Sequence, residues 1–69
     1  MFIELTNDAS DFELRGKKFL INIHYLEFYS LGNGKVRIVD NYVGRNLYVK
    51  ETYEEIKQKI IDAGALKCP

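Results

Sequence analysis

The residues best suited to catalysis or metal binding are few in this chain of 69 residues, and they lie far apart in the sequence. His24 is the only histidine and Cys68 the only cysteine. A cysteine nucleophile needs a rigidly held thiolate, and Cys68 stands next to the last residue, where a chain commonly frays. A metal site on His24 would need Glu27 as a second ligand, but side chains three positions apart in a strand diverge. We therefore expect no catalytic residue, no metal ligand and no cofactor.

Two pairs of acidic residues have the composition of a general acid and base, but each pair has a structural explanation. Asp8 and Asp11 fall in a cluster of turn-forming residues. Glu54 and Glu55 follow Thr52 with the spacing of a capping box. In that motif the Thr hydroxyl accepts a hydrogen bond from the amide three residues later, and the Glu side chain accepts one from the Thr amide. The acids therefore predict turns and a helix start, and we expect the chain not to be an enzyme.

The composition indicates a small globular domain. Hydrophobic residues make up 46% and aromatic residues 13% of the chain, and ten basic residues balance ten acidic ones. Disordered chains carry fewer apolar residues and more net charge, and nucleic-acid binders are commonly basic. A single cysteine excludes an intramolecular disulfide and is typical of a reducing compartment. We expect one cytoplasmic domain over residues 1–69, with 64–69 as a flexible tail, no signal peptide and no membrane span.

Hydrophobic patterning predicts an antiparallel sheet. Alternating or continuous apolar stretches, separated by turn-forming residues, indicate strands. The expected strands cover residues 2–6, 19–21, 26–31, 35–39 and 47–49, residues 22–25 redirect the chain between two of them, and residues 12–14 form either a short strand or a loop.

The sequence Gly32-Asn33-Gly34 predicts a tight hairpin between two of these strands. Asn-Gly is the preferred two-residue loop of type I′, in which both residues have a positive φ. We therefore expect Asn33 and Gly34 at the two central positions of such a turn.

The hydrophobic period changes after Thr52 and predicts a C-terminal helix. Tyr53, Ile56, Ile60 and Ala63 recur at helical spacing, and Gly64 is suited to the left-handed position just past a helix end. The predicted fold class is α+β, a small antiparallel sheet of three to five strands followed by one helix packed on one face. The helix is expected to pack on Ile3, Leu5, Ile21, Val36, Ile38, Leu47 and Val49.

Tyrosine and arginine side chains favour a recognition surface on the sheet face that the helix leaves open. Neighbouring strand residues point to opposite faces, so Tyr29, Arg37, Val39 and Tyr48 are expected on the open one. Tyr and Arg are enriched at protein interfaces, although cross-strand pairing within the sheet alone also explains such residues. The predicted partner-binding residues are Tyr29, Arg37, Tyr42, Arg45 and Tyr48.

Strand edges add a reason to expect self-association. A small domain buries little core, and an unpaired edge is a template for pairing with another chain. Residues 2–6 and 47–49 are the candidate edges, and neither contains a proline. We therefore expect a homodimer in which the tyrosines named above supply the apolar contact.

Three segments resemble the small FlbD-like proteins of flagellar and swarming motility. Residues 19–22 (FLIN), followed by Leu26 and Glu27, resemble the F-x-L-N…I-E stretch of that family. Residues 47–56 (LYVKETYEEI) resemble its closing V-V-K-E-S-x-E-E-V-I motif, and residues 3–6 are similar to its first strand. Similar strand-and-helix patterns occur in small bacterial and phage proteins. The resemblance implies a small non-enzymatic accessory protein of bacterial or phage origin.

Three functions follow as hypotheses. The leading one is a non-catalytic module that binds another protein and associates with itself. The second is a nucleic-acid-binding accessory domain using the open sheet face, which a positive stripe of Lys35, Arg37, Arg45 and Lys50 would favour. The third is a phage-type oligomer that sequesters a small molecule at its subunit interfaces.

Overall fold

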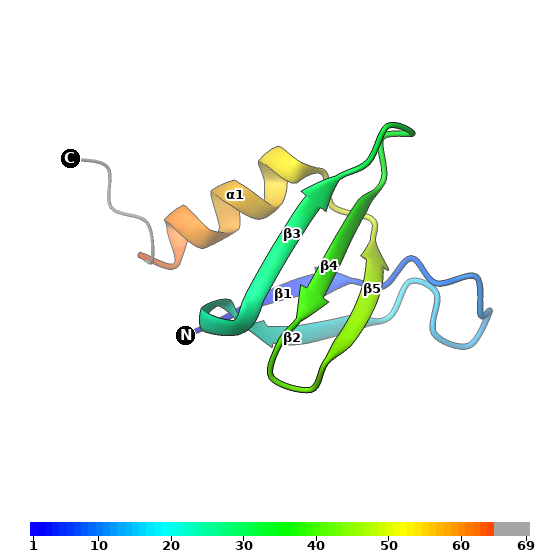
Figure 1. Ribbon diagram of the computed structural model, residues 1–69, viewed down its shortest axis with the longest axis horizontal. Helices are drawn as coiled ribbons and strands as arrows, with labels where there is room; N and C mark the ends of the chain where they lie inside the picture. The colour runs from blue at the N-terminus through cyan, green and yellow to red at the C-terminus, as the bar shows by residue number, and fades with distance from the viewer. Residues whose placement is uncertain (65–69) are drawn as a thin grey trace.

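The computed structural model describes residues 1–64, which form five strands, a short 3-10 helix and one α-helix (Figure 1). The expected α+β fold class is confirmed. Of the expected tail, residues 64–69, only Gly64 is among the described residues, and Cys68 lies outside them. The elements in chain order are β1 (Phe2–Thr6), β2 (Lys18–Asn22), η1 (Ile23–Tyr25), β3 (Leu26–Ser30), β4 (Val36–Asp40), β5 (Arg45–Val49) and α1 (Tyr53–Asp62).

The strands form two antiparallel sheets. β1 pairs with β2, and β3, β4 and β5 pair in sequence order as a meander. The 3-10 helix η1 turns the chain from one sheet into the other, as expected for residues 22–25. Asn22 begins this turn, because its side chain accepts a hydrogen bond of 3.0 Å from the backbone N–H of His24.

The two sheets meet where β1 ends beside the end of β5. Asn7 forms an isolated bridge with Val49, and the Lys50 N–H donates to the Thr6 carbonyl at 2.9 Å. Residues 2–6 and 47–49, which were expected to present free edges, do lie at the edges of their sheets, and they meet only at this junction. Within residues 1–64, the strands that have an edge with no strand paired along it are β1, β2, β3 and β5.

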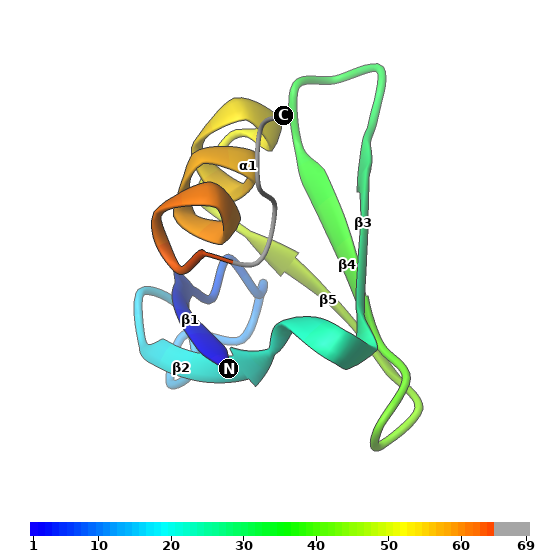
Figure 2. The ribbon, with the colours of Figure 1, turned by 90° about the vertical axis from the view of Figure 1, so that its left-hand side faces the viewer.

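The core lies between the sheets and the helix. Figure 2 shows α1 and the β1–β2 hairpin on the same side of the β3–β4–β5 sheet. Every expected core residue except Leu47 is buried, and Leu47 packs partly buried at the margin. Full burial of one such side chain contributes about 1.5–3 kcal/mol, so eight of them dominate the stability of a small domain. The buried apolar residues are Ile3, Leu5, Ile21, Val36, Ile38, Val49, Ile56 and Ile60.

The turn between β3 and β4 differs from the expected type I′ turn. Gly34 has a φ of 81°, but Asn33 does not have a positive φ. The Gly34 N–H donates to the Leu31 carbonyl at 3.1 Å and the Leu31 N–H donates to the Lys35 carbonyl at 2.8 Å. These bonds define a three-residue loop with glycine at its left-handed position. Asn33 acts through its side chain instead, since its Oδ1 accepts from the Lys35 N–H at 3.0 Å.

Both ends of α1 follow the sequence prediction. The Thr52 hydroxyl accepts from the Glu55 N–H at 3.1 Å, and the Glu55 carboxylate accepts from the Thr52 N–H at 2.9 Å. This is the complete capping box. Gly64 has a φ of 81° and donates to the Ile61 carbonyl at 2.9 Å, which ends the helix. No helix within residues 1–64 has the length and apolar character required to cross a membrane.

Candidate interaction surface

Three of the predicted partner-binding residues form one row across the β3–β4–β5 sheet. Tyr29 of β3 is paired with Arg37 of β4, and Arg37 is paired with Tyr48 of β5. Directly paired residues of antiparallel strands point to the same face. Residues Phe28 and Ile38, which alternate with this row, face the core. The row therefore lies on the outer face, opposite the helix and the β1–β2 hairpin (Figure 2).

The two tyrosines of this row are accessible to a partner. Tyr29 is 45% exposed and Tyr48 is 46% exposed. The guanidinium carbon of Arg37 lies 5.7 Å from the centroid of the Tyr29 ring, which is cation–π geometry. This contact holds the long arginine side chain against the sheet, so less of its conformational freedom remains to be lost on binding.

A second row lies beside the first on the same face. Glu27, Val39 and Asn46 are paired across β3, β4 and β5. Val39 is half-buried, while Glu27 and Asn46 are exposed. Glu27 accepts a hydrogen bond of 3.0 Å from the side-chain amide of Asn41. The outer face thus carries an acid, a base, two tyrosines, one amide and one aliphatic side chain, which is a surface of mixed charge.

Tyr42 and Arg45 are not part of this face. Arg45 points to the opposite face of β5, where its Nε lies 3.5 Å from Oδ2 of Asp40 and its guanidinium carbon lies 5.7 Å from the Phe19 ring centroid. Tyr42 lies in the loop between β4 and β5, and its ring centroid is 5.2 Å from that of Tyr25. The structure therefore separates the five predicted residues into a face of three and a second region containing the other two.

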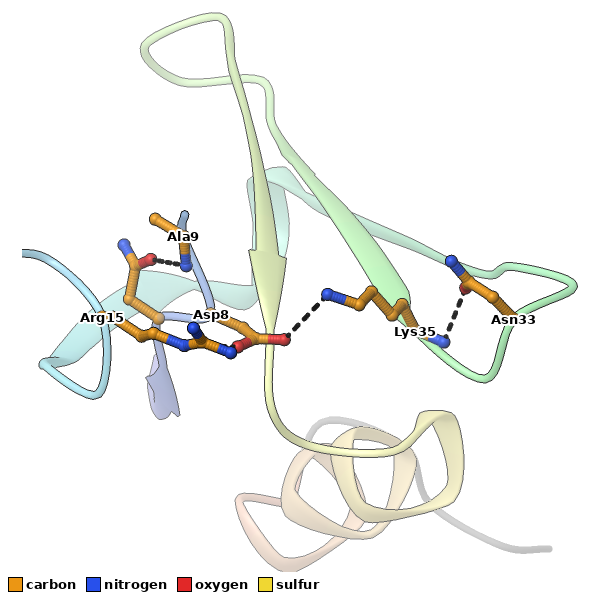
Figure 3. A network of polar contacts seen from close by, with 6 residues as sticks. Asp8, Ala9, Arg15, Asn33 and Lys35 are labelled. Atoms are coloured by element: carbon orange, nitrogen blue, oxygen red, sulfur yellow. Dashed lines mark hydrogen bonds and ion pairs between the residues drawn. The ribbon is translucent and has the colours of Figure 1, made fainter. Parts of the chain in front are cut away.

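Lys35 is engaged in an ion-pair network at the sheet junction (Figure 3). Asp8 lies between two bases, with its Oδ2 3.5 Å from the Lys35 Nζ and its Oδ1 3.6 Å from the Arg15 Nε. Residues 11–16 form turns, so the stretch 12–14 is a loop, and this network ties that loop to the β3–β4 turn. Lys35 and Arg45 are thus both paired with acids.

A groove that the sequence did not reveal lies beside this second region. Its volume is about 400 Å³. It is assembled from β1, β2, η1, β4 and the β4–β5 loop, so no sequence spacing indicates it. Its lining consists of Phe2, Leu20, Ile21, Asn22, Tyr25, Asp40 and Tyr42.

Outside the outer face and the groove, the polar side chains give no sign of a metal site or of a catalytic group within residues 1–64. Within residues 1–64 no group of three or more His, Cys, Asp and Glu side chains lies close enough to hold a metal ion. The pKa of Glu55 is lowered, chiefly by the hydrogen bond from the Thr52 backbone N–H and then by the Thr52 side chain. That shift belongs to the helix cap and not to the outer face or the groove.

Comparison of the chain with protein-family models, with curated proteins and with solved structures finds no match. The function is therefore argued from the outer face and the groove themselves.

Proposed function

We propose that this chain is a non-catalytic protein-interaction module that associates with itself through the outer face of the β3–β4–β5 sheet and binds a further protein. The proposal includes a cytoplasmic, bacterial or phage setting, on the strength of the FlbD-like resemblance. The observation that carries it is the exposed row formed by Tyr29, Arg37 and Tyr48.

The chemistry of this row is that of a protein interface. Tyrosine supplies a large contact area with few rotatable bonds, and both Tyr and Arg are enriched among residues that dominate binding energy. The half-buried Val39 adjoins the row and adds apolar area. Nucleic-acid binding receives less support, because Lys35 and Arg45 are paired with acids and Glu27 lies on the same face as Arg37. Sequestration of a small molecule by an oligomer has no residue-level support on this face.

A second copy of the chain is a suitable occupant because the face is self-complementary. A two-fold interface brings the same surface of both copies together. Glu27 and Arg37 lie in adjacent rows, so a two-fold arrangement can set the arginine of one copy near the acid of the other. The net charge of zero also leaves little long-range repulsion between copies.

Sedimentation equilibrium over a range of protein concentrations tests this proposal. We expect the parent chain to form a dimer and Tyr48→Glu to remain monomeric, because burial of an unpaired carboxylate in the interface is unfavourable. Tyr42→Glu is the matched control, since the same change is made at an exposed tyrosine away from the face. A monomeric parent at the highest concentration, or a Tyr48→Glu chain that dimerises like the parent, would contradict the proposal.

A further inference from the structure

The free edge of β2 presents unpaired backbone groups. The Asn7 N–H donates to the Lys17 carbonyl at 2.8 Å, and the Ile23 N–H donates to the Met1 carbonyl at 3.1 Å. The backbone N–H and C=O groups of the odd-numbered residues from 17 to 23 therefore point toward β1. Backbone groups of alternate residues point to opposite sides of a strand. The N–H and C=O groups of Lys18, Leu20 and Asn22 therefore point away from β1, where no strand within residues 1–64 pairs with them.

The groove runs along this free edge. Three consecutive residues of β2 line it, namely Leu20, Ile21 and Asn22. Leu20 and Asn22 lie on one face of the β1–β2 hairpin together with Phe2, and Ile21 lies on the other. Because β1 occupies one edge of β2, a groove that borders both faces passes the free edge. Leu20 is 63% exposed, while Ile21 is buried in the core. The groove thus offers backbone hydrogen-bonding groups on one side.

Aromatic rings and one carboxylate form the rest of the groove. The rings of Phe2, Tyr25 and Tyr42 border it, and Tyr42 is 74% exposed. Asp40 is the only charged residue of the lining, and its side chain is 10% exposed. Aromatic faces attract cations, and a carboxylate of low exposure does so more strongly than one in open solvent.

Asp40 retains the capacity to accept a further hydrogen bond. Its Oδ1 accepts from the Tyr42 N–H at 3.0 Å. Its Oδ2 lies 3.5 Å from the Arg45 Nε, which is longer than a charge-assisted hydrogen bond. Asp40 is thus already paired with Arg45, and a second cation entering from the groove would share its carboxylate, as Lys35 and Arg15 share that of Asp8.

We propose that this groove binds an extended peptide segment of a partner protein, which adds to β2 as a new strand and places a Lys or Arg side chain beside Tyr25 and Tyr42, directed toward Asp40. Strand addition supplies main-chain hydrogen bonds, and the groove selects the side chain. The site rests on the proposed protein-binding function and specifies where the further partner binds and which kind of side chain it inserts. It lies apart from the Tyr29–Arg37–Tyr48 row.

A titration followed by ¹⁵N NMR tests the site with a blocked peptide of alternating threonine and valine around a central lysine. We expect the amide signals of Leu20 and Asn22 to shift on binding. Replacement of the lysine by norleucine should weaken binding about fivefold or more. N-methylation of those alternate peptide amides that face β2 in the added strand should abolish binding without changing the protein. Failure of the lysine peptide to bind, equal affinity of the norleucine peptide, or unimpaired binding of the N-methylated peptide would overturn the proposal.

Variants of the chain locate the site. Asp40→Asn and Tyr42→Ala should each weaken binding of the lysine peptide, whereas Tyr48→Glu should bind it as the parent does. Loss of dimerisation in Tyr48→Glu with retained peptide binding separates the two proposals. Loss of peptide binding in Tyr48→Glu would place the peptide on the outer face and overturn the groove site.

A simple amine provides the last comparison. Butylammonium chloride carries the cation without a backbone, so we expect it to bind at least tenfold more weakly than the lysine peptide. Equal affinity would show that strand addition contributes nothing, and would overturn the proposed binding of a peptide.

Discussion

Glu51 accepts two hydrogen bonds from Thr6, one from the backbone N–H and one from the hydroxyl, each of 2.8 Å. The two residues are 45 positions apart in the chain. Thr6 is the last residue of β1, and its N–H has no partner in a neighbouring strand within residues 1–64. The Glu51 carboxylate accepts the hydrogen bond that such a strand would otherwise accept. The segment that leads into α1 is thereby fastened to the end of β1.

Glu51→Ala should lower the free energy of unfolding by about 1–3 kcal/mol. The reason is that a partly buried amide and hydroxyl each lose their hydrogen-bond partner. Urea denaturation followed by circular dichroism measures the change. Glu13→Ala, at an exposed loop position, is the control and should unfold like the parent. Equal midpoints for the Glu51 and Glu13 variants would show that the contact with Thr6 adds no stability.

Thr52→Ala should cost about 0.5–2 kcal/mol of stability. The substitution removes the hydroxyl that accepts from the Glu55 N–H, so the first turn of α1 loses its side-chain cap. Thr52→Ser keeps the hydroxyl and should retain most of the stability. Thermal unfolding measures both variants, and an alanine variant as stable as the serine one would contradict the role of the cap.

The same cap predicts a pH dependence. The pKa of Glu55 is lower in the folded chain than in the unfolded one, because the Thr52 N–H donates to its carboxylate. Its stabilising effect is therefore fully present above the ordinary pKa of a glutamate and is lost as the pH falls through the lower, folded value. Glu55→Gln should lose less stability than the parent over that acidic range. Denaturation midpoints measured across the range would refute the prediction if the two chains changed in parallel.

Ile60→Ala should destabilise the domain by about 2–5 kcal/mol, since it leaves a cavity where α1 packs on the sheets. Domains of this size have little stability in reserve, so part of the population should be unfolded at room temperature. Ile61→Ala is the neighbouring control on the same helix, because Ile61 is only half-buried. Equal losses in the two variants would mean that α1 does not dock through Ile60.

Gly34→Ala should destabilise the β3–β4 turn by about 1–2 kcal/mol, because its φ of 81° is unfavourable for a residue with a Cβ. Gly32→Ala is the matched control in the same loop. Neither position has a neighbouring atom within 4 Å of an added Cβ, so the comparison isolates backbone strain. We expect Gly32→Ala to unfold like the parent or at a slightly higher temperature. An equal or larger loss in Gly32→Ala would contradict this account.

The helix and the core were predictable because their signals are local and periodic. Ile56 and Ile60 recur at helical spacing, and the capping box of Thr52 marks the helix start within four residues. Tyr29 and Tyr48 could likewise be assigned to the outer face, because strand alternation decides the side on which each residue lies. Such patterns hold wherever the element is placed in the fold.

The features that were missed depend on contacts between distant segments or on a choice that the local sequence leaves open. Asn33 is compatible with either sign of φ, and its side-chain bond to the Lys35 amide favours the turn that forms. The junction of Asn7 with Val49 and the groove beside Tyr42 are assembled from segments far apart in the chain. The expected strand began at residue 47, so alternation could not place Arg45, which lies in β5 and meets Asp40 and Phe19.

The junction between β1 and β5 also joins segments that are made at different times during synthesis. The β3–β4–β5 meander closes through short loops, whereas β1 reaches β5 only across a separation of about 45 residues. Closing a longer loop costs more entropy and slows folding. During synthesis, Ile3 and Leu5 leave the ribosome before Val49 and Ile56, with which they share the core. The apolar face of the β1–β2 hairpin therefore cannot be covered before β5 and α1 have been made, although its own residues precede them in the chain.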